Sequence, residues 1–192
     1  MGLRNGVFQV YNVESKENLA SGQVAKGAIY DICLGIHVNE LICGDEYDNI
    51  IKISFDRKTK EAKHVWRTGE SSIGGVRSVT LSQSRKFIAA GGNFKLVVVL
   101  SEHNGSMLQK LEHKTEGEVV QILWSPTDDF LLALSQRELY LIRREEKKMV
   151  FQDVKKSWVE KSNTFCTICA DWERRLIYIG DSKGKIWQIL IK

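Results

Sequence analysis

The chain has almost no proline, no low-complexity segment and no long apolar run. Pro126 is its single proline, whereas long linkers between domains are usually rich in proline or in glycine and serine. No apolar run approaches the roughly 20 residues of a membrane-spanning helix. The N-terminal MGLRNGVFQV also lacks the layout of a signal peptide. These absences predict a chain without a long linker and without a membrane contact.

Cysteine is scarce as well, with four in 192 residues. Few cysteines and no secretory signal are typical of a reducing compartment, so we expect an intracellular protein of the cytoplasm or nucleus. Cys166-Thr167-Ile168-Cys169 resembles a metal or redox motif. On a strand, however, residues i and i+3 point to opposite faces, and no second such pair completes a zinc site. We expect packed core thiols and no metal.

Signs of catalysis are absent. The sequence has no Gly-x-Ser-x-Gly elbow and no glycine-rich loop leading into a helix, where a phosphate would bind. Asp128-Asp129 and Asp45-Glu46 are paired acids, but they stand where hairpins favour polar turn residues. The histidines lack metal-ligand spacing. We therefore expect no enzyme activity, no catalytic residue and no cofactor.

The composition excludes a disordered chain, because it is too rich in apolar residues. Hydrophobic residues make up 43% and charged residues 27%, which is ordinary for a globular protein. The net charge of +4 is spread over lysine-rich turns that acids interrupt, and a nucleic-acid footprint would need clustering on one face. Four basic residues remain candidates for such a contact: Lys155, Lys156, Arg174 and Arg175.

A repeat of short apolar runs takes the place of helical periodicity. In Glu118–Arg143, three runs of strand length are separated by two polar turns, which predicts an antiparallel meander. The first run recurs around Ile32, Val79, Ile122 and Ile168, with spacings of 47, 43 and 46 residues. Four copies at nearly constant spacing predict a repeat fold.

Each copy predicts up to four strands, which we label a to d. Strands a are expected at Ile29–Leu34, Val76–Leu81, Val119–Trp124 and Phe165–Ala170. Strands b are expected at Glu40–Cys43, Lys86–Ala90, Phe130–Leu134 and Arg175–Ile179. Strands c are expected at Gly6–Tyr11, Asn49–Ser54, Lys95–Leu100, Glu138–Arg143 and Lys185–Ile189. Strands d are expected at Glu17–Gln23, Ala62–Arg67, Met107–Glu112 and Met149–Val154. The inner strands are almost continuously apolar, as expected for strands buried on both faces.

A period of about 43–47 residues with four strands per unit predicts an all-β fold, a β-propeller. The sequence resembles the WD40 family, which carries an aromatic-Ser-Pro turn after strand a, here Trp124-Ser125-Pro126. The b–c turns of the family, small residues followed by Asp, are approached by Gly44-Asp45 and Gly180-Asp181. No Gly-His precedes a strand a and no strand c ends in Trp-Asp, so the resemblance is to degenerate members of the family.

About four to five blades are expected in one propeller domain. The predicted units are an incomplete blade with strands c and d (1–24), three blades (25–70, 71–114 and 115–160) and a set of strands a to c (161–192). The resemblance implies a seven-bladed ring, so we expect this chain to be part of a larger ring or to be completed by a partner. A small closed ring, or further blades that the sequence pattern conceals, is the alternative.

The d–a and b–c loops of a propeller meet at one rim, where we expect the partner to bind. The candidate residues there are aromatic or basic: Tyr30, Tyr47, Arg77, Lys95 and Phe165. Trp172, beside Arg174 and Arg175, is a further candidate anchor because tryptophan is enriched at interfaces. The sequence predicts a non-catalytic WD40-repeat scaffold that binds other protein subunits or peptide segments in an intracellular complex. The alternative is an accessory subunit of an RNA- or DNA-processing complex with direct nucleic-acid contacts.

Overall fold

The computed structural model describes residues 1–69, 74–93, 95–111, 115–144, 151–157 and 164–191, with 151–157 described by their backbone. These residues form seventeen strands and no helix. The strands are β1 (Val7–Tyr11), β2 (Asn18–Gln23), β3 (Ile29–Leu34), β4 (Glu40–Asp45), β5 (Ile50–Phe55), β6 (Ala62–Arg67), β7 (Val76–Leu81), β8 (Phe87–Gly92), β9 (Val97–Ser101), β10 (Met107–Leu111), β11 (Val119–Trp124), β12 (Phe130–Ser135), β13 (Leu139–Arg144), β14 (Phe151–Ser157), β15 (Phe165–Asp171), β16 (Leu176–Asp181) and β17 (Ile186–Leu190).

The strands form five antiparallel sheets that follow one another along the chain. The first sheet holds β1 and β2, the second β3–β6, the third β7–β10, the fourth β11–β14 and the fifth β15–β17. Within each sheet, strands that are consecutive in the sequence pair with each other, as the turn-separated apolar runs predict. The expectation of an all-β fold is confirmed. Every predicted strand is present, although its ends differ from the prediction by up to three residues, and Met149 and Glu112 lie outside the described residues.

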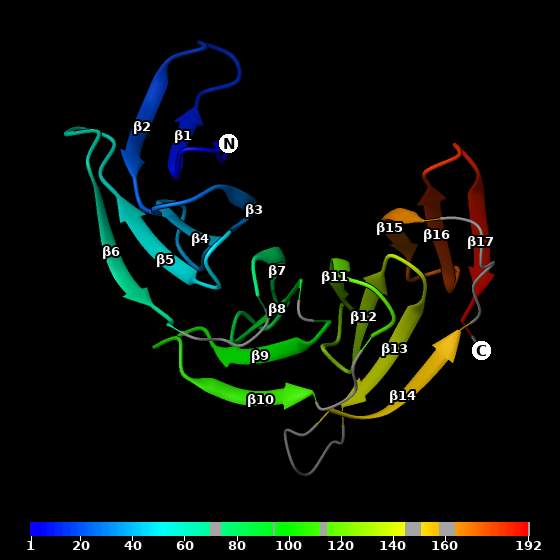
Figure 1. Cartoon of the computed structure of the whole chain (residues 1–192). Helices are drawn as coiled ribbons and strands as arrows, with labels where there is room; N and C mark the ends of the chain where they lie inside the picture. Colours follow the sequence, from blue (N-terminus) through cyan, green and yellow to red (C-terminus); the bar gives the residue numbers. More distant parts are fainter. Residues whose placement is uncertain (70–73, 94, 112–114, 145–150, 158–163, 192) are drawn as a thin grey trace.

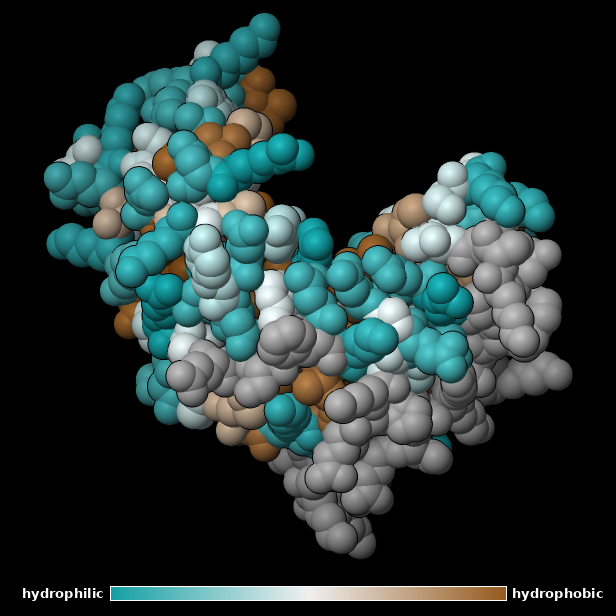
Figure 2. Space-filling model, viewed as in Figure 1, coloured by the Kyte–Doolittle hydropathy of each residue, from teal (hydrophilic) through white to brown (hydrophobic). Residues whose placement is uncertain are grey.

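The sheets stand side by side around an open arc (Figure 1). Strands β3, β7, β11 and β15 line its inside, whereas β6, β10 and β14 lie on its outside. The first and fifth sheets face each other across a notch, which the space-filling view also shows (Figure 2). Among the described residues there is no helix with the length and apolar character needed to span a bilayer.

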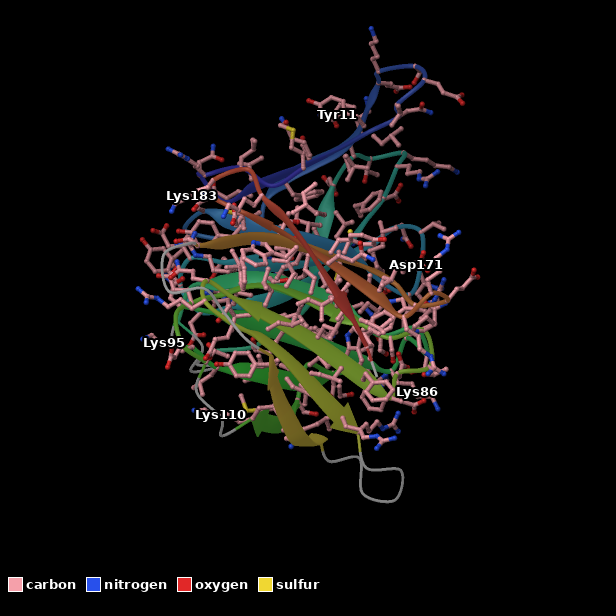
Figure 3. All side chains as sticks on the ribbon, turned by 90° about the vertical axis from the view of Figure 1, so that its right-hand side faces the viewer. Tyr11, Lys86, Lys95, Lys110, Asp171 and Lys183 are labelled. Atoms are coloured by element: carbon pink, nitrogen blue, oxygen red, sulfur yellow. The ribbon has the colours of Figure 1, made fainter. Side chains whose placement is uncertain are left out.

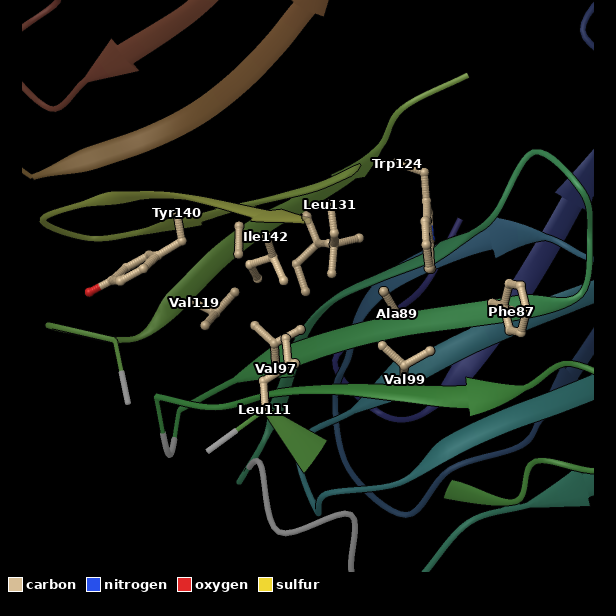
Figure 4. Packing of buried hydrophobic residues seen from close by; sticks show 12 residues of the cluster. Phe87, Ala89, Val97, Val99, Leu111, Val119, Trp124, Leu131, Tyr140 and Ile142 are labelled. Carbon is tan, nitrogen blue, oxygen red and sulfur yellow. The ribbon is translucent and has the colours of Figure 1, made fainter. Parts of the chain in front are cut away.

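Four hydrophobic clusters fill the junctions between successive sheets. The cluster between the third and fourth sheets joins Phe87 and Val99 to Trp124 and Ile142, and the Phe87 and Trp124 rings stack with centroids 6.3 Å apart (Figure 4). Ile88, the neighbour of Phe87, packs into the cluster toward the second sheet instead. Because alternate residues of a strand serve opposite faces, the inner strands are buried on both sides. This is why their sequences are almost continuously apolar.

Glycine near the end of strand b allows neighbouring sheets to approach closely. A Cβ on Gly44 would lie 2.4 Å from Cγ1 of Val76, and one on Gly91 would lie 2.6 Å from Cγ1 of Val119. Gly2 repeats this relationship, since its Cβ would lie 2.6 Å from Cγ2 of Ile29. Gly2 bridges to Phe8 of β1, so residues 1–3 cover part of the inner edge of the first sheet.

Each pairing of strands a and b contains a β-bulge at an equivalent position. The register shifts fall between Ile29 and Asp31, Val76 and Ser78, Val119 and Gln121, and Phe165 and Thr167. A bulge bends its strand and re-aims a side chain. The skipped residues include Tyr30 and Arg77, two of the predicted partner-binding residues.

Candidate partner-binding face

The two ends of the sheets form two opposite faces of the arc. Figure 3 shows Lys95 and Lys183, which belong to b–c turns, on one face. Lys86, in an a–b turn, and Asp171, at the end of strand β15 just before such a turn, lie on the other. Gly75, at the described end of a d–a loop, lies on the first of these faces, because a Cβ on it would lie 2.9 Å from Nδ2 of Asn93 in a b–c turn. We call this first face the rim.

On the rim, Tyr30 and Arg77 are in direct contact. The guanidinium carbon of Arg77 lies 4.2 Å from the centroid of the Tyr30 ring, a cation–π arrangement between the second and third sheets. Nε of Arg77 also donates a hydrogen bond to Oδ1 of Asn93, at 2.8 Å. Nη2 lies 3.9 Å from the carboxylate of Glu118 on the next sheet. Arg77 therefore has a fixed orientation, with its side chain still 38% exposed.

Tyr47 and Lys95 occupy the b–c turns of the second and third sheets. Tyr47 is 61% exposed, and its ring covers Gly27, where a Cβ would lie 2.6 Å from Cε2. Its turn is held by Asp45, which is buried and accepts hydrogen bonds from the backbone N–H groups of Tyr47 and Asn49, both at 2.9 Å. Lys95 is exposed and adopts a positive φ of 64°. Both side chains are thus exposed at the surface, and the turn of Tyr47 is held in place by Asp45.

Phe165 and Trp172 do not lie with these four residues. Phe165 is 4% exposed and packs against Leu134 and Ile179 in the core between the fourth and fifth sheets. It begins strand β15 and is no part of an exposed loop, so its ring is unavailable at the rim. Trp172 begins the a–b turn of the fifth sheet, directly after Asp171, which lies on the opposite face (Figure 3). It is partly buried against the same core.

Some acidic side chains near the rim are buried. Glu138 is 5% exposed and accepts a hydrogen bond from the hydroxyl of Tyr140. The same hydroxyl accepts a hydrogen bond from the backbone N–H of Glu116, at 3.0 Å. Burial and the bond to Glu138 raise the pKa of Tyr140 above its usual value. These groups hold the fourth sheet together and offer no charge to a ligand.

A row of side-chain to backbone hydrogen bonds joins the strands a. Oδ2 of Asp31 accepts from the N–H of Val79 at 2.8 Å. Ser78 accepts from Ile122 at 3.1 Å, and Gln121 accepts from Ile168 at 2.9 Å. The three acceptors stand just after the bulges, at equivalent positions of successive sheets. Sequence alone gave no sign of this row, because the three acceptors belong to different residue types.

A buried ionic group joins the second and third sheets. Nζ of Lys52 lies 2.6 Å from Oε1 of Glu102 and 3.2 Å from Oε2 of Glu40. The three side chains are 7%, 3% and 12% exposed. Oε2 of Glu40 also accepts the backbone N–H of His37, at 3.2 Å. All charges in the group are therefore paired, so it is a structural contact with no free acid or base.

The cysteines are divided between core and surface. Cys43 is fully buried and Cys33 is half-buried, and burial raises the pKa of each thiol to about 12. Cys166 and Cys169 are exposed, so the interpretation of the Cys-x-x-Cys segment as packed core thiols is wrong. Their strand β15 is the edge strand inside the arc, with only part of it covered by the fourth sheet. No group of three or more His, Cys, Asp or Glu side chains within the described residues could hold a metal ion.

The basic residues considered for nucleic acid are not gathered into a described patch. Nη1 of Arg174 pairs with Oδ2 of Asp171 at 2.8 Å. The side chains of Lys155 and Lys156 lie outside the described residues. Arg175 is exposed in the a–b turn of the fifth sheet.

An apolar hollow lies on the inside of the arc, between β1 and β3. It encloses about 540 Å³ and is lined by Val10, Tyr11, Tyr30 and Leu34 together with the N-terminal Met1. Leu34 is 71% exposed, Met1 67% and Tyr11 45%. Apolar surface is visible beside the notch at the first sheet (Figure 2). The sequence does not predict this hollow, because its lining joins the N-terminus, β1 and β3, which come together only in the fold.

Comparison with known proteins does not assign this chain to a family. The sequence matches no protein-family model, and no curated protein matches it significantly. Inferences about function must therefore come from the geometry just described.

Proposed function

We propose that the chain is a WD40-like propeller segment that acts as a non-catalytic scaffold and binds other protein subunits. The successive antiparallel sheets, buried junctions and equivalent bulges support a propeller-like repeat. The second to fifth sheets are linked to one another by hydrogen bonds at strands a, which supports a rigid surface. A scaffold needs such rigidity, since ordering a surface on binding costs affinity.

The observation that carries this proposal is the apolar hollow inside the arc, between β1 and β3. Met1, Tyr11 and Leu34 are exposed over 67%, 45% and 71% of their surface, and all three line one hollow of about 540 Å³. Contiguous exposed apolar surface marks an interaction site more often than a free surface, because exposing it to water is unfavourable. The rim adds Tyr30, which belongs to both the hollow and the Arg77 contact. A protein surface with apolar and aromatic side chains is the partner that suits this hollow.

The test is affinity purification of the native protein with mass measurement of the chain and of its partners. A double variant, Tyr11→Asp with Leu34→Asp, places two charges in the hollow and should abolish the binding of at least one copurifying protein. Val13→Asp with Val38→Asp is the matched control, because Val13 and Val38 are 91% and 82% exposed and lie outside the hollow. The proposal is wrong if both double variants copurify with the same partners. It is also wrong if the wild type and the control copurify with no partner.

A further inference from the structure

The a–b turns on the face opposite the rim are linked across two of the sheet junctions. Arg85, Asp128 and Arg175 are equivalent turn residues with φ of 60°, 60° and 57°. Nη1 of Arg85 donates to the carbonyl of Ile36 on the preceding sheet, at 2.8 Å. Asp128 accepts the N–H groups of two residues of the preceding turn, at 2.7 and 2.9 Å. Side chains at this position therefore reach back to the sheet before them.

Among the described residues, the junction between the fourth and fifth sheets lacks this link and contains a groove. The described residues supply no hydrogen bond or ion pair to the Arg175 side chain, which is exposed. Instead, Arg175 lines a groove of about 560 Å³ between the a–b turns of the fourth and fifth sheets. The apolar walls of this groove include Pro126, Phe130 and Trp172. We call it the Trp172 groove.

Positive charge predominates at the Trp172 groove. Arg143 lines it, with its guanidinium carbon 5.5 Å from the centroid of the Phe130 ring. Among the described residues that line it, Arg175 is the second base and Glu173 the one acid. Arg174, by contrast, is paired with Asp171 and is not part of the lining. Two guanidiniums beside an apolar pocket suit an apolar group that stands next to a carboxylate, because arginine binds carboxylates in a bidentate geometry.

We propose that the Trp172 groove binds a peptide segment of a protein partner, in which a large apolar side chain stands near an aspartate or glutamate. The apolar side chain contacts Trp172 and Phe130, and the carboxylate pairs with Arg143 and Arg175. The volume is within the range of about 300–1,000 Å³ of sites for small ligands, which fits one large side chain and its flanking backbone. This inference rests on the proposed scaffold function and adds a second site, on the face opposite the rim, with a stated partner chemistry.

The experiment titrates the whole chain with acetylated hexapeptides. One series carries leucine or phenylalanine at one to three positions from an aspartate, and a second series carries lysine in place of the aspartate. The readout is the indole N–H signal of Trp172 in a two-dimensional ¹H–¹⁵N spectrum, which Trp172→Phe identifies. We expect a saturable shift with the acidic series and at least about tenfold weaker binding of the lysine series, which corresponds to 1.4 kcal/mol.

Charge reversal provides the decisive comparison. Arg143→Glu with Arg175→Glu should invert the preference, so that the lysine series binds better. Arg174→Glu is the matched control and should leave the preference unchanged. If no acidic peptide moves the Trp172 signal, or if the double variant keeps the wild-type preference in an otherwise unchanged spectrum, the groove proposal is wrong. Copurified partners that depend on Tyr11 and Leu34 would then still support the scaffold function, so the two failures are distinguishable.

Discussion

The carboxylate of Asp128 accepts the backbone N–H of Gln83 at 2.7 Å across the junction between the fourth and third sheets. Its second oxygen accepts the N–H of Ser84 at 2.9 Å. Asp128 is 2% exposed, so both donors would lose their partner in a place that water scarcely reaches. The Asp-Asp pair, interpreted as turn structure, is thus also a contact between sheets.

Asp128→Asn should lower the free energy of unfolding by about 1–3 kcal/mol, because the amide offers one acceptor where the carboxylate offers two. Asparagine tolerates the positive φ of this position, so backbone strain contributes little. Asp129→Asn, in the same turn but exposed, should change stability by less than about 0.5 kcal/mol. Urea unfolding followed by tryptophan fluorescence measures both. Equal effects of the two variants would show that the bonds to Gln83 and Ser84 contribute nothing.

Lys52→Met should destabilise the protein far more, by about 3–5 kcal/mol, since it leaves the carboxylates of Glu40 and Glu102 buried and without their cation. The matched control is Lys60→Met, which breaks the exposed pair with Glu17 at 3.6 Å. An exposed ion pair contributes about 0–1 kcal/mol. Unfolding midpoints in urea compare the two variants directly.

Adding Glu40→Gln and Glu102→Gln to Lys52→Met tests the cause. The neutral triple variant should recover part of the lost stability, because no charge is then buried. A triple variant less stable than Lys52→Met alone would contradict this account and assign the loss to packing.

The strand pattern could be predicted from sequence because it depends on local features. In Val119–Trp124, an apolar run is followed by Ser125-Pro126 and a polar turn, and both the strand and the turn formed as expected. The positions of Tyr30 and Arg77 on one rim followed from the repeat spacing. Their direct contact did not, because it depends on bulges that re-aim both side chains.

Contacts between distant parts of the chain could not be predicted. Lys52 lies in the apolar run of β5, and its partner Glu102 is fifty residues away. Nothing local shows which acid it meets. Phe165 begins strand β15, as its apolar run predicts, but its ring packs into the core between the fourth and fifth sheets and not at the rim, because the neighbouring sheet covers it. Cys166 and Cys169 are expected in the core because they stand in an apolar strand a, but both are exposed, and exposure depends on the neighbouring sheet and not on the strand itself.

Gly44→Ala and Gly91→Ala should each cost about 1–3 kcal/mol through overpacking. The new methyl groups would lie 2.4 Å and 2.6 Å from Val76 and Val119, which belong to the next sheet. Gly69→Ala is the control, because no atom of the described residues lies within 4 Å of its Cβ. Thermal unfolding should show two destabilised variants and one that is unchanged or slightly more stable. If Gly69→Ala is as damaging as the other two, close approach of the sheets is not the reason for these glycines.

The buried thiol of Cys43 should make the protein less stable at high pH. Burial raises its pKa to about 12 in the folded state, whereas an unfolded cysteine ionises near pH 8.5. Below about pH 8.5 the thiol is protonated in both states and its ionisation has no effect. Above that pH the unfolded state loses the proton first, so the free energy of unfolding falls as the pH rises toward 12.

At pH 10 the loss from Cys43 should be about 2 kcal/mol. Urea midpoints between pH 7.5 and 10.5 measure it, with Cys43→Ala as the comparison, because that variant lacks the ionisable group. Its absolute stability is lower through the lost packing, but its slope with pH should be shallower than that of the wild type. The thiol reagent DTNB gives a second measurement: at pH 8, Cys166 and Cys169 should react before Cys43, which is fully buried. Parallel pH slopes for wild type and Cys43→Ala would mean that this thiol ionises alike in the folded and unfolded states.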